Sequence, residues 1–197
     1  MAWEYRGVRD LVYAEVTADT SSSYTTGTVK ELAPVANIAK QTANGSETHY
    51  YDNDPTIIVQ STGADTITID CAGIELSVLA EITGQVYQST TGAMFEVGSR
   101  TPKYFAIGYK TKKTNGNEIY VWRLKGMFSI PDENSATEDD GTNANGVQLV
   151  YSGISTTKEF TDSNGTAKSV VVDTELNLCT SLSTFFSTVQ TPDTITP

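Results

Sequence analysis

The sequence predicts a mainly β protein: antiparallel strands with one short flanking α-helix, an extended loop and terminal arms. Serine and threonine occur in many short runs and 38% of the residues are hydrophobic, which favours short strands and exposed connections over helices. Two strand-like runs flank Asn115-Gly116, a dipeptide typical of a two-residue hairpin turn. Clear helical spacing of apolar residues is confined to one short stretch before Gly84.

Length and charge limit both the architecture and the function. The 197 residues suit one domain, residues 1–197, with a full core or with long arms. The net charge of −11 disfavours a free-standing nucleic-acid binder, which needs a basic surface. No apolar run is long enough for a signal sequence or a membrane span, so no membrane partner is expected. We expect Cys71 and Cys179 to be two buried thiols of a protein made in a reducing cytoplasm, with a disulfide between them as the alternative.

The first third of the chain predicts strands joined by polar connections. Residues 7–17 form a first strand with Val8, Val12, Ala14 and Val16 on one side. Residues 28–40 form a second, which Pro34 restricts to a sheet edge or a bulge.

Residues 41–63 are predicted to form a long loop. Asn44-Gly45 and the stretch Asp52–Pro55 are turn signals, and Thr48–Tyr51 pairs with Thr56–Gln60 if the loop is an extended hairpin. More than about twenty residues without core periodicity is long for a passive connection, because long loops in compact domains are usually functional or disordered.

The next segment changes from a strand to a helix. Asp65–Cys71 alternates apolar and polar residues and predicts a strand half buried in a sheet. From Ile74 to Ile82 the apolar residues lie on one helical face, and Gly84 supplies the C-terminal stop. This helix is expected to cover an end or a face of the sheets.

The stretch from Thr101 to Pro131 predicts the central hairpin. A two-residue loop at Asn115-Gly116 places residues whose numbers sum to 231 opposite each other. One face is then aromatic and aliphatic, which predicts a buried core. Its pairs are Tyr109 with Trp122, Ile107 with Leu124, and Phe105 with Gly126, whose missing side chain leaves room for the Phe105 ring.

The second face of this hairpin carries small and β-branched residues with four basic ones: Lys110, Lys112, Arg123 and Lys125. Two interpretations remain open for it. The face meets another protein surface, or it meets water, as one face of an antiparallel sheet often does.

The rest of the chain predicts an acidic loop, two strands and an apolar tail. The loop is residues 131–141, the strands are Val147–Ser155 and Lys168–Asp173, and the C-terminal segment is residues 174–197. Apolar residues at near-helical spacing between Leu178 and Val189 predict a short helix that docks on the domain or on a neighbouring copy.

The sequence offers little catalytic chemistry. Its one histidine, His49, has no neighbours spaced as metal ligands or as a catalytic group. The acidic run Glu138–Asp140 lacks the alternating oxygens and the glycine of a calcium loop, which indicates a solvated loop. We expect no enzyme activity, no metal and no cofactor.

Four blocks of sequence, taken in order, resemble a known family. They are GVRDLVYAEV, GIELSVLAEITG, KYFAIGYKTKKTNGNEIYVWRLKGMFSIPDEN and TFFSTVQTP, and they extend from about Gly7 to Pro192. Together they resemble the phage major tail proteins of the phi13 type, which are tail-tube proteins of long, non-contractile bacteriophage tails. The central block is the most specific, whereas the segment after Asp52 and the stretch 156–170 are individual to this chain.

The resemblance implies a tail-tube type fold, which is an antiparallel β-sandwich, and a structural role in the virion. It also makes the hairpin face that carries Lys110, Lys112, Arg123 and Lys125 a candidate interface or lumen face. Subunits of this family form stacked hexameric rings around a lumen, through which phage DNA passes during ejection without specific binding. The implied partners are other copies of the chain, the tape-measure protein, and the tail terminator and distal tail proteins, assembled in the host cytoplasm. The alternative is an acidic β-sandwich binding module, such as a virion surface or adhesin-like protein.

Within this picture residues 41–63 are predicted to be an assembly loop that contacts an adjacent subunit or ring. The alternative is a hairpin packed on its own domain. Asn44 lies at a turn that aims the loop, and the anchors would be its aromatic and aliphatic residues, since such groups dominate interface hot spots. These anchors are Tyr50, Tyr51, Ile57, Ile58 and Val59.

Overall fold

The computed structural model describes residues 2–133, 146–176 and 178–195. It contains thirteen strands, one α-helix and three short 3-10 helices. Their bounds are β1 Tyr5–Asp19, β2 Tyr24–Thr26, β3 Lys30–Glu31, β4 Val35–Tyr51, β5 Asp54–Cys71, α1 Leu76–Thr83, β6 Val86–Gln88, β7 Ala93–Phe95, β8 Phe105–Lys113, β9 Glu118–Phe128, β10 Val147–Gly153, β11 Glu159–Phe160, β12 Gly165–Thr166, β13 Ser169–Asp173, η1 Thr174–Leu176, η2 Thr180–Thr184 and η3 Pro192–Thr194.

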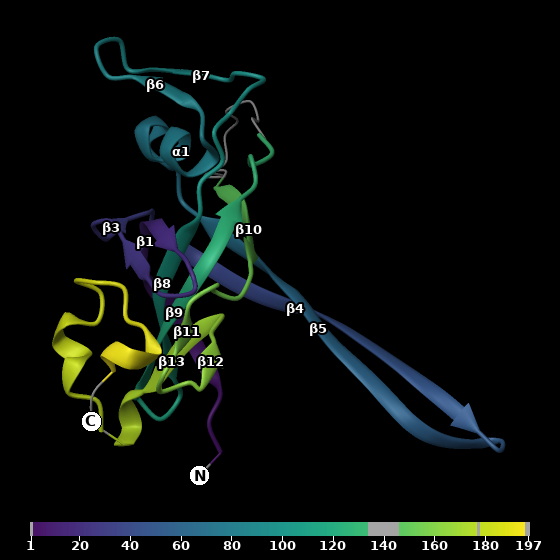
Figure 1. Ribbon diagram of the computed structural model, residues 1–197. Coiled ribbons are helices and arrows are strands. Elements are labelled where there is room, and N and C mark those ends of the chain that lie inside the picture. The colour runs from purple at the N-terminus through teal and green to yellow at the C-terminus, as the bar shows by residue number, and fades with distance from the viewer. Residues whose placement is uncertain (1, 134–145, 177, 196–197) are drawn as a thin grey trace, which may run out of the picture.

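One large antiparallel sheet of nine strands dominates the molecule (Figure 1). Its strand order is β2-β1-β8-β9-β10-β5-β4, with β3 paired to β1 and β13 paired to β9. Two small sheets, β6–β7 and β11–β12, are not hydrogen-bonded into it as further strands. The prediction of a mainly β fold with one short helix is confirmed. Among the described residues the large sheet does not close into a barrel.

The main core lies on one face of the large sheet. It joins Leu11 and Tyr13 of β1 to Ile67 and Ile69 of β5, strands that lie far apart in the strand order. A flat sheet keeps such residues apart, so the sheet curls around this core. Helix α1 covers one end of it through Ile82, as the sequence predicts for this helix. Gly84 ends α1 in the left-handed conformation, with φ of 73°.

A second apolar cluster lies on the opposite face and is covered by the end of the chain. Trp122 of β9 is completely buried there, and its indole N–H donates to the carbonyl oxygen of Phe185 at 2.9 Å. Phe185 and Val189, which follow the 3-10 helix η2, are buried in the same cluster. The apolar tail therefore docks on its own domain, and it does so largely without α-helix.

The β8–β9 hairpin differs from its prediction in both turn and register. Its loop has three residues, because the Gly116 N–H donates to the Lys113 carbonyl at 3.0 Å and the Lys113 N–H to the Asn117 carbonyl at 2.8 Å. Gly116 has a φ of 96°, whereas Asn115 does not take a positive φ, so the loop is a type I turn followed by a glycine bulge.

This turn moves the pairing by one residue along most of the hairpin. The observed pairs are Gly108 with Trp122, Tyr109 with Val121 and Ile107 with Arg123. A bulge between Phe105 and Ile107 then restores Phe105 opposite Gly126. The predicted pairs of Tyr109 with Trp122 and Ile107 with Leu124 are therefore wrong, and only the Phe105–Gly126 pair is confirmed.

The register change distributes the predicted core residues over two faces. All five are buried, but Phe105, Ile107 and Tyr109 belong to the main core, whereas Trp122 and Leu124 belong to the second cluster. Both faces of the hairpin are thus packed with protein. The space at Gly126 is filled by Tyr151, because a Cβ atom there would lie 2.3 Å from the Tyr151 Cζ.

The first strand also alternates differently from its prediction. Asp10 has a φ of 55°, and the register of β1 shifts between Arg9 and Val12. Val8 therefore packs against the main core, whereas Val12 and Ala14 lie in the second cluster. The prediction that Val8 shares a face with Val12 is wrong, because a bulge reverses the alternation.

Candidate assembly surface

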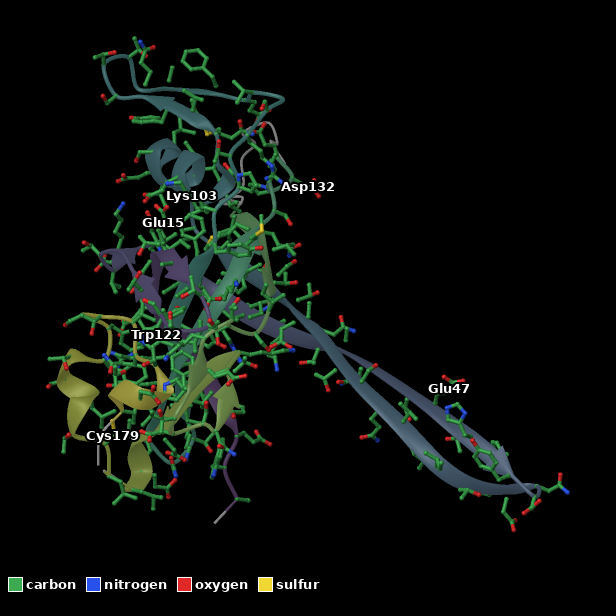
Figure 2. The ribbon with its side chains drawn as sticks, in the orientation of Figure 1. Glu15, Glu47, Lys103, Trp122, Asp132 and Cys179 are labelled. Carbon is green, nitrogen blue, oxygen red and sulfur yellow. The ribbon has the colours of Figure 1, made fainter. Side chains whose placement is uncertain are left out.

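Strands β4 and β5 extend beyond the large sheet as a two-stranded arm, residues 43–64 (Figure 1). Every residue of this β4–β5 arm is exposed. Figure 2 places Glu47 on the arm, far from Trp122 at the centre of the sheet. An isolated two-stranded hairpin is marginally stable in water, so this geometry favours a second surface that covers the arm.

The arm turns at Asp52 and Asn53, one of the two places predicted. Both residues have positive φ, 53° and 66°, which is typical of a two-residue type I′ turn. The predicted turn at Asn44-Gly45 is wrong, because these residues lie inside β4 opposite Thr62 and Ser61. This turn signal lies next to a register shift between Thr42 and Asn44. The strand continues past the shift and does not reverse direction.

The five predicted anchor residues lie at the outer end of the arm. Their exposed fractions are 66% for Tyr50, 57% for Tyr51, 48% for Ile57, 63% for Ile58 and 52% for Val59. They occupy both faces of the two-stranded arm, because neighbouring residues of a strand point to opposite sides. Exposed apolar groups gathered in this way mark interaction surfaces.

The base of the arm is held by a buried carboxylate. Asp65 is 3% exposed, accepts a hydrogen bond from the Thr42 hydroxyl at 2.9 Å, and lies 3.6 Å from the Lys40 ammonium and 3.5 Å from that of Lys168. Burial raises the pKa of Asp65, but the hydroxyl and the two ammonium groups outweigh this effect and lower the pKa overall. Lys168 also donates to the carbonyl of Gly63. These bonds anchor the arm to the sheet.

The four basic hairpin residues do not form the single face predicted for them. Lys110 binds Asp10 at 2.8 Å and stands over the Tyr120 ring, and Lys125 binds Asp19 at 2.6 Å. Arg123 lies on the other face, with the main core, as a result of the register change. Lys112 is exposed.

The Asp19–Lys125 pair makes a testable contribution to stability. Asp19 also accepts the backbone N–H groups of Thr157 and Lys158, at 2.7 and 2.9 Å. Its side chain is 4% exposed and that of Lys125 is 11% exposed. Removing one partner of a buried pair leaves the other charge uncompensated, so Asp19→Asn should lower the free energy of unfolding by about 3–5 kcal/mol at neutral pH.

The pH dependence of this effect follows from the pKa of Asp19. Burial raises the pKa, but the Lys125 ammonium and the two N–H donors outweigh burial and lower it overall. Its contribution is therefore present above the unfolded-state pKa of about 3.9 and is lost as the pH falls through the lower folded-state value. Urea unfolding at pH 7 and pH 3 should show the deficit of Asp19→Asn shrinking in acid. The control is Glu15→Gln, which breaks the more exposed Lys103–Glu15 pair, whose residues are labelled in Figure 2. It should lower the free energy of unfolding by at most about 1 kcal/mol. Equal losses in the two variants would contradict the assignment of Asp19–Lys125 as a buried stabilising pair.

Arg123 lines an open cleft of about 470 Å³ between the edges of β1 and β4. Its guanidinium donates to the Tyr109 hydroxyl at 3.2 Å. Within the described part of the chain, its buried Nε and the Thr111 hydroxyl have no hydrogen-bond partner. Thr111 and Arg123 both line this open cleft, although these two atoms are themselves buried.

A second exposed apolar region was not anticipated from the sequence. The β6–β7 hairpin, at the far end of α1 in Figure 1, exposes Val86, Tyr87 and Phe95, with exposed fractions of 50%, 38% and 48%. Two short apolar runs around a Thr-Thr-Gly turn, residues 86–95, are the signal that would have indicated this hairpin.

The remaining candidates supply no further site. His49 is an exposed residue of the arm opposite Ile57. Cys71 and Cys179 are not joined by a disulfide, and Cys71 donates to the Val147 carbonyl at 3.3 Å. Cys71 is buried as predicted, but Cys179 is only half-buried, so the prediction is wrong for Cys179. The acidic run 138–140 lies outside the described residues. Across the ranges that the structure describes, no group of His, Cys, Asp and Glu is arranged to hold a metal ion, and no helix is long and apolar enough to cross a membrane.

Comparison with known proteins adds no assignment. No protein family matches the sequence, and no curated protein matches it significantly.

Proposed function

We propose that this chain is a structural virion protein, the subunit of a phage tail tube. In this proposal it adopts a tail-tube type β-sandwich fold and polymerises into hexameric rings that stack around a lumen. It acts as a conduit for DNA ejection and not as an enzyme. Its partners are further copies of itself, the tape-measure protein, and the tail terminator and distal tail proteins.

The observation that carries the proposal is the β4–β5 arm. In the part of the chain that the structure describes, each of its five large apolar residues is about half exposed or more. A subunit that polymerises along an axis needs contacts other than those that close its ring. An arm that extends beyond the domain is suited to such a contact, because it reaches past the subunit's own surface.

The charge of the chain supports the conduit role. With a formal net charge of −11, the subunit repels the phosphate backbone, so DNA is expected to slide through an assembled lumen without adhering. Lys110 and Lys125 are paired with Asp10 and Asp19 within the subunit, so neither ammonium group is left unpaired to bind phosphate.

Electron microscopy of the purified protein tests the proposal. At high concentration the protein should form rings or tubes of uniform bore, and two-dimensional averages of end views should give the ring order. Sedimentation velocity should show the same assemblies in solution. Monomers that persist at every concentration and salt condition, above all monomers that bind glycans, would instead favour a binding module.

A further inference from the structure

The first part of β1 forms a basic surface on an otherwise acidic chain. Two adjoining clefts, of about 180 and 350 Å³, both border Arg6 and Lys112. The charged side chains that line them are four basic residues and one acidic residue: Arg6, Arg9, Lys112, Lys113 and Glu118. We refer to these five residues as the β1 basic surface.

Two of these cations are already neutralised within the subunit. Arg9 is ion-paired with Glu118, and Lys113 binds Glu175 at 2.8 Å and also Asp173. Arg6 and Lys112 are exposed and form no ion pair with any residue that the structure describes. The surface thus presents two unpaired positive charges, against one surplus negative charge from the second carboxylate at Lys113.

The surroundings of this surface are also open to a partner. Tyr5 is 67% exposed and Trp3 is 37% exposed, with their rings edge to face at 5.2 Å. On the side of β1 away from β8, β3 pairs with Val12 and Tyr13, and β2 pairs from Val16 onward. The stretch before them has no strand on that side among the described residues, so the edge of β1 that carries Arg6 is open to a partner.

The β4–β5 arm has the opposite character. Residues 41–64 contain Glu47, Asp52 and Asp54 and no lysine or arginine. The register pairs Glu47 with Val59, His49 with Ile57 and Tyr51 with Asp54. Because paired residues share a side and alternate residues of a strand point the same way, one face of the arm combines two carboxylates with apolar groups. These are Glu47, His49, Tyr51, Asp54, Ile57 and Val59.

We propose that this face of the arm in one copy docks on the β1 basic surface of a second copy, so that Glu47 and Asp54 meet Arg6 and Lys112. The arm tip and the N-terminal end of β1 are separated in Figure 1, so the contact forms between copies. It joins two different patches, so it propagates from copy to copy instead of closing a symmetric dimer. This inference rests on the proposed function and names the surface that the arm contacts.

Charge reversal on each side tests the contact. Variant A carries Arg6→Glu and Lys112→Glu, and variant B carries Glu47→Lys and Asp54→Lys. All four side chains are exposed, so both variants should keep the melting temperature of the parent. Each variant alone sets like charges against each other, which should raise the concentration needed for assembly at least about tenfold. In an equimolar mixture, the acidic arm of A meets the basic β1 surface of B, and the basic arm of B meets the acidic β1 surface of A. The mixture should therefore assemble as the parent does.

Sedimentation velocity and electron microscopy at low and high salt give the readout. The charge control carries Arg100→Glu and Lys158→Glu, which change the net charge as variant A does but lie outside the β1 basic surface. Both residues are half-buried, so its melting temperature is measured first, and the folded control should assemble normally. Weakening of the parent's assembly by salt is also expected, because exposed charges are screened.

The outcomes separate this inference from the proposed function. If the parent forms tubes and variant A forms them equally well, the docking assignment is wrong and the tube proposal stands. If the parent forms no tubes, the tube proposal fails, and the mixture of A and B still tests the contact. Association of the mixture, but not of A or B alone, would support the docking contact. No association of the mixture at high concentration would overturn it.

Discussion

Trp122→Ala is expected to lower the free energy of unfolding by about 3–5 kcal/mol. Trp122 is completely buried, its N–H donates to the Phe185 carbonyl at 2.9 Å, and the Phe186 ring lies 5.6 Å from it, centre to centre. Truncation removes this packing and leaves a buried carbonyl without its donor. The loss is a large part of the 5–15 kcal/mol that stabilises a typical domain, so much of the protein is expected to unfold on mild heating.

Urea unfolding followed by circular dichroism measures this effect without depending on tryptophan fluorescence. Tyr51→Ala is the matched control, since it removes an aromatic ring from the exposed arm and should leave the unfolding midpoint unchanged. Trp122→Phe keeps most of the ring but not the N–H donor, and it should fall between the two. A midpoint for Trp122→Ala equal to that of the parent would mean that the C-terminal segment does not pack on β9.

Replacing residues 44–60 by a short Gly/Ser linker is expected to abolish tube formation while leaving the subunit folded. All the residues removed are exposed, and the cost of loop closure changes only slowly with loop length. The bonds that Asp65 makes to Thr42, Lys40 and Lys168 at the base of the arm are retained. The melting temperature should therefore stay within a few degrees of the parent's, because a change of 1 kcal/mol shifts it by about 2–4 °C.

A second variant separates the length of the arm from its apolar anchors. It keeps the arm and changes its five large apolar residues, Tyr50, Tyr51, Ile57, Ile58 and Val59, to threonine, which retains a preference for strands. It should also fold and fail to assemble, as judged by electron microscopy and sedimentation. Tubes from either variant like those of the parent would show that the arm is not an assembly element. Failure of the linker variant to fold would show that the arm belongs to the subunit's own core.

Local sequence patterns were sufficient to predict several elements. Strict alternation placed β5 from Asp65 to Cys71, and the change to helical spacing with Gly84 at its end placed α1. The length and turn signals of residues 41–63 identified the segment that forms the arm. These features depend on periodicity and on backbone preferences of single residues, which are properties of short stretches of chain.

The register of the β8–β9 hairpin could not be obtained from such patterns. A shift of one residue moves every side chain to the other face, and alternation identifies the correct register only where one face is polar. Here both faces are buried: Ile107 and Tyr109 pack into the main core, and Trp122 packs under Phe185 and Phe186 from the end of the chain. No polar face therefore contradicted the two-residue turn that Asn115-Gly116 indicates, although the observed loop is one residue longer.

The candidate assembly surface could also be predicted only in part from the sequence. Its residues were identified from the sequence, because exposed aromatic and aliphatic groups between turn signals are a local property. Their arrangement depends on the β4–β5 pairing, which runs through Asn44-Gly45 and turns at Asp52-Asn53. The roles of the basic residues depended on partners far away in sequence, such as Asp10 for Lys110 and Asp19 for Lys125. Long-range packing assigns such partners, and no short stretch of sequence contains that information.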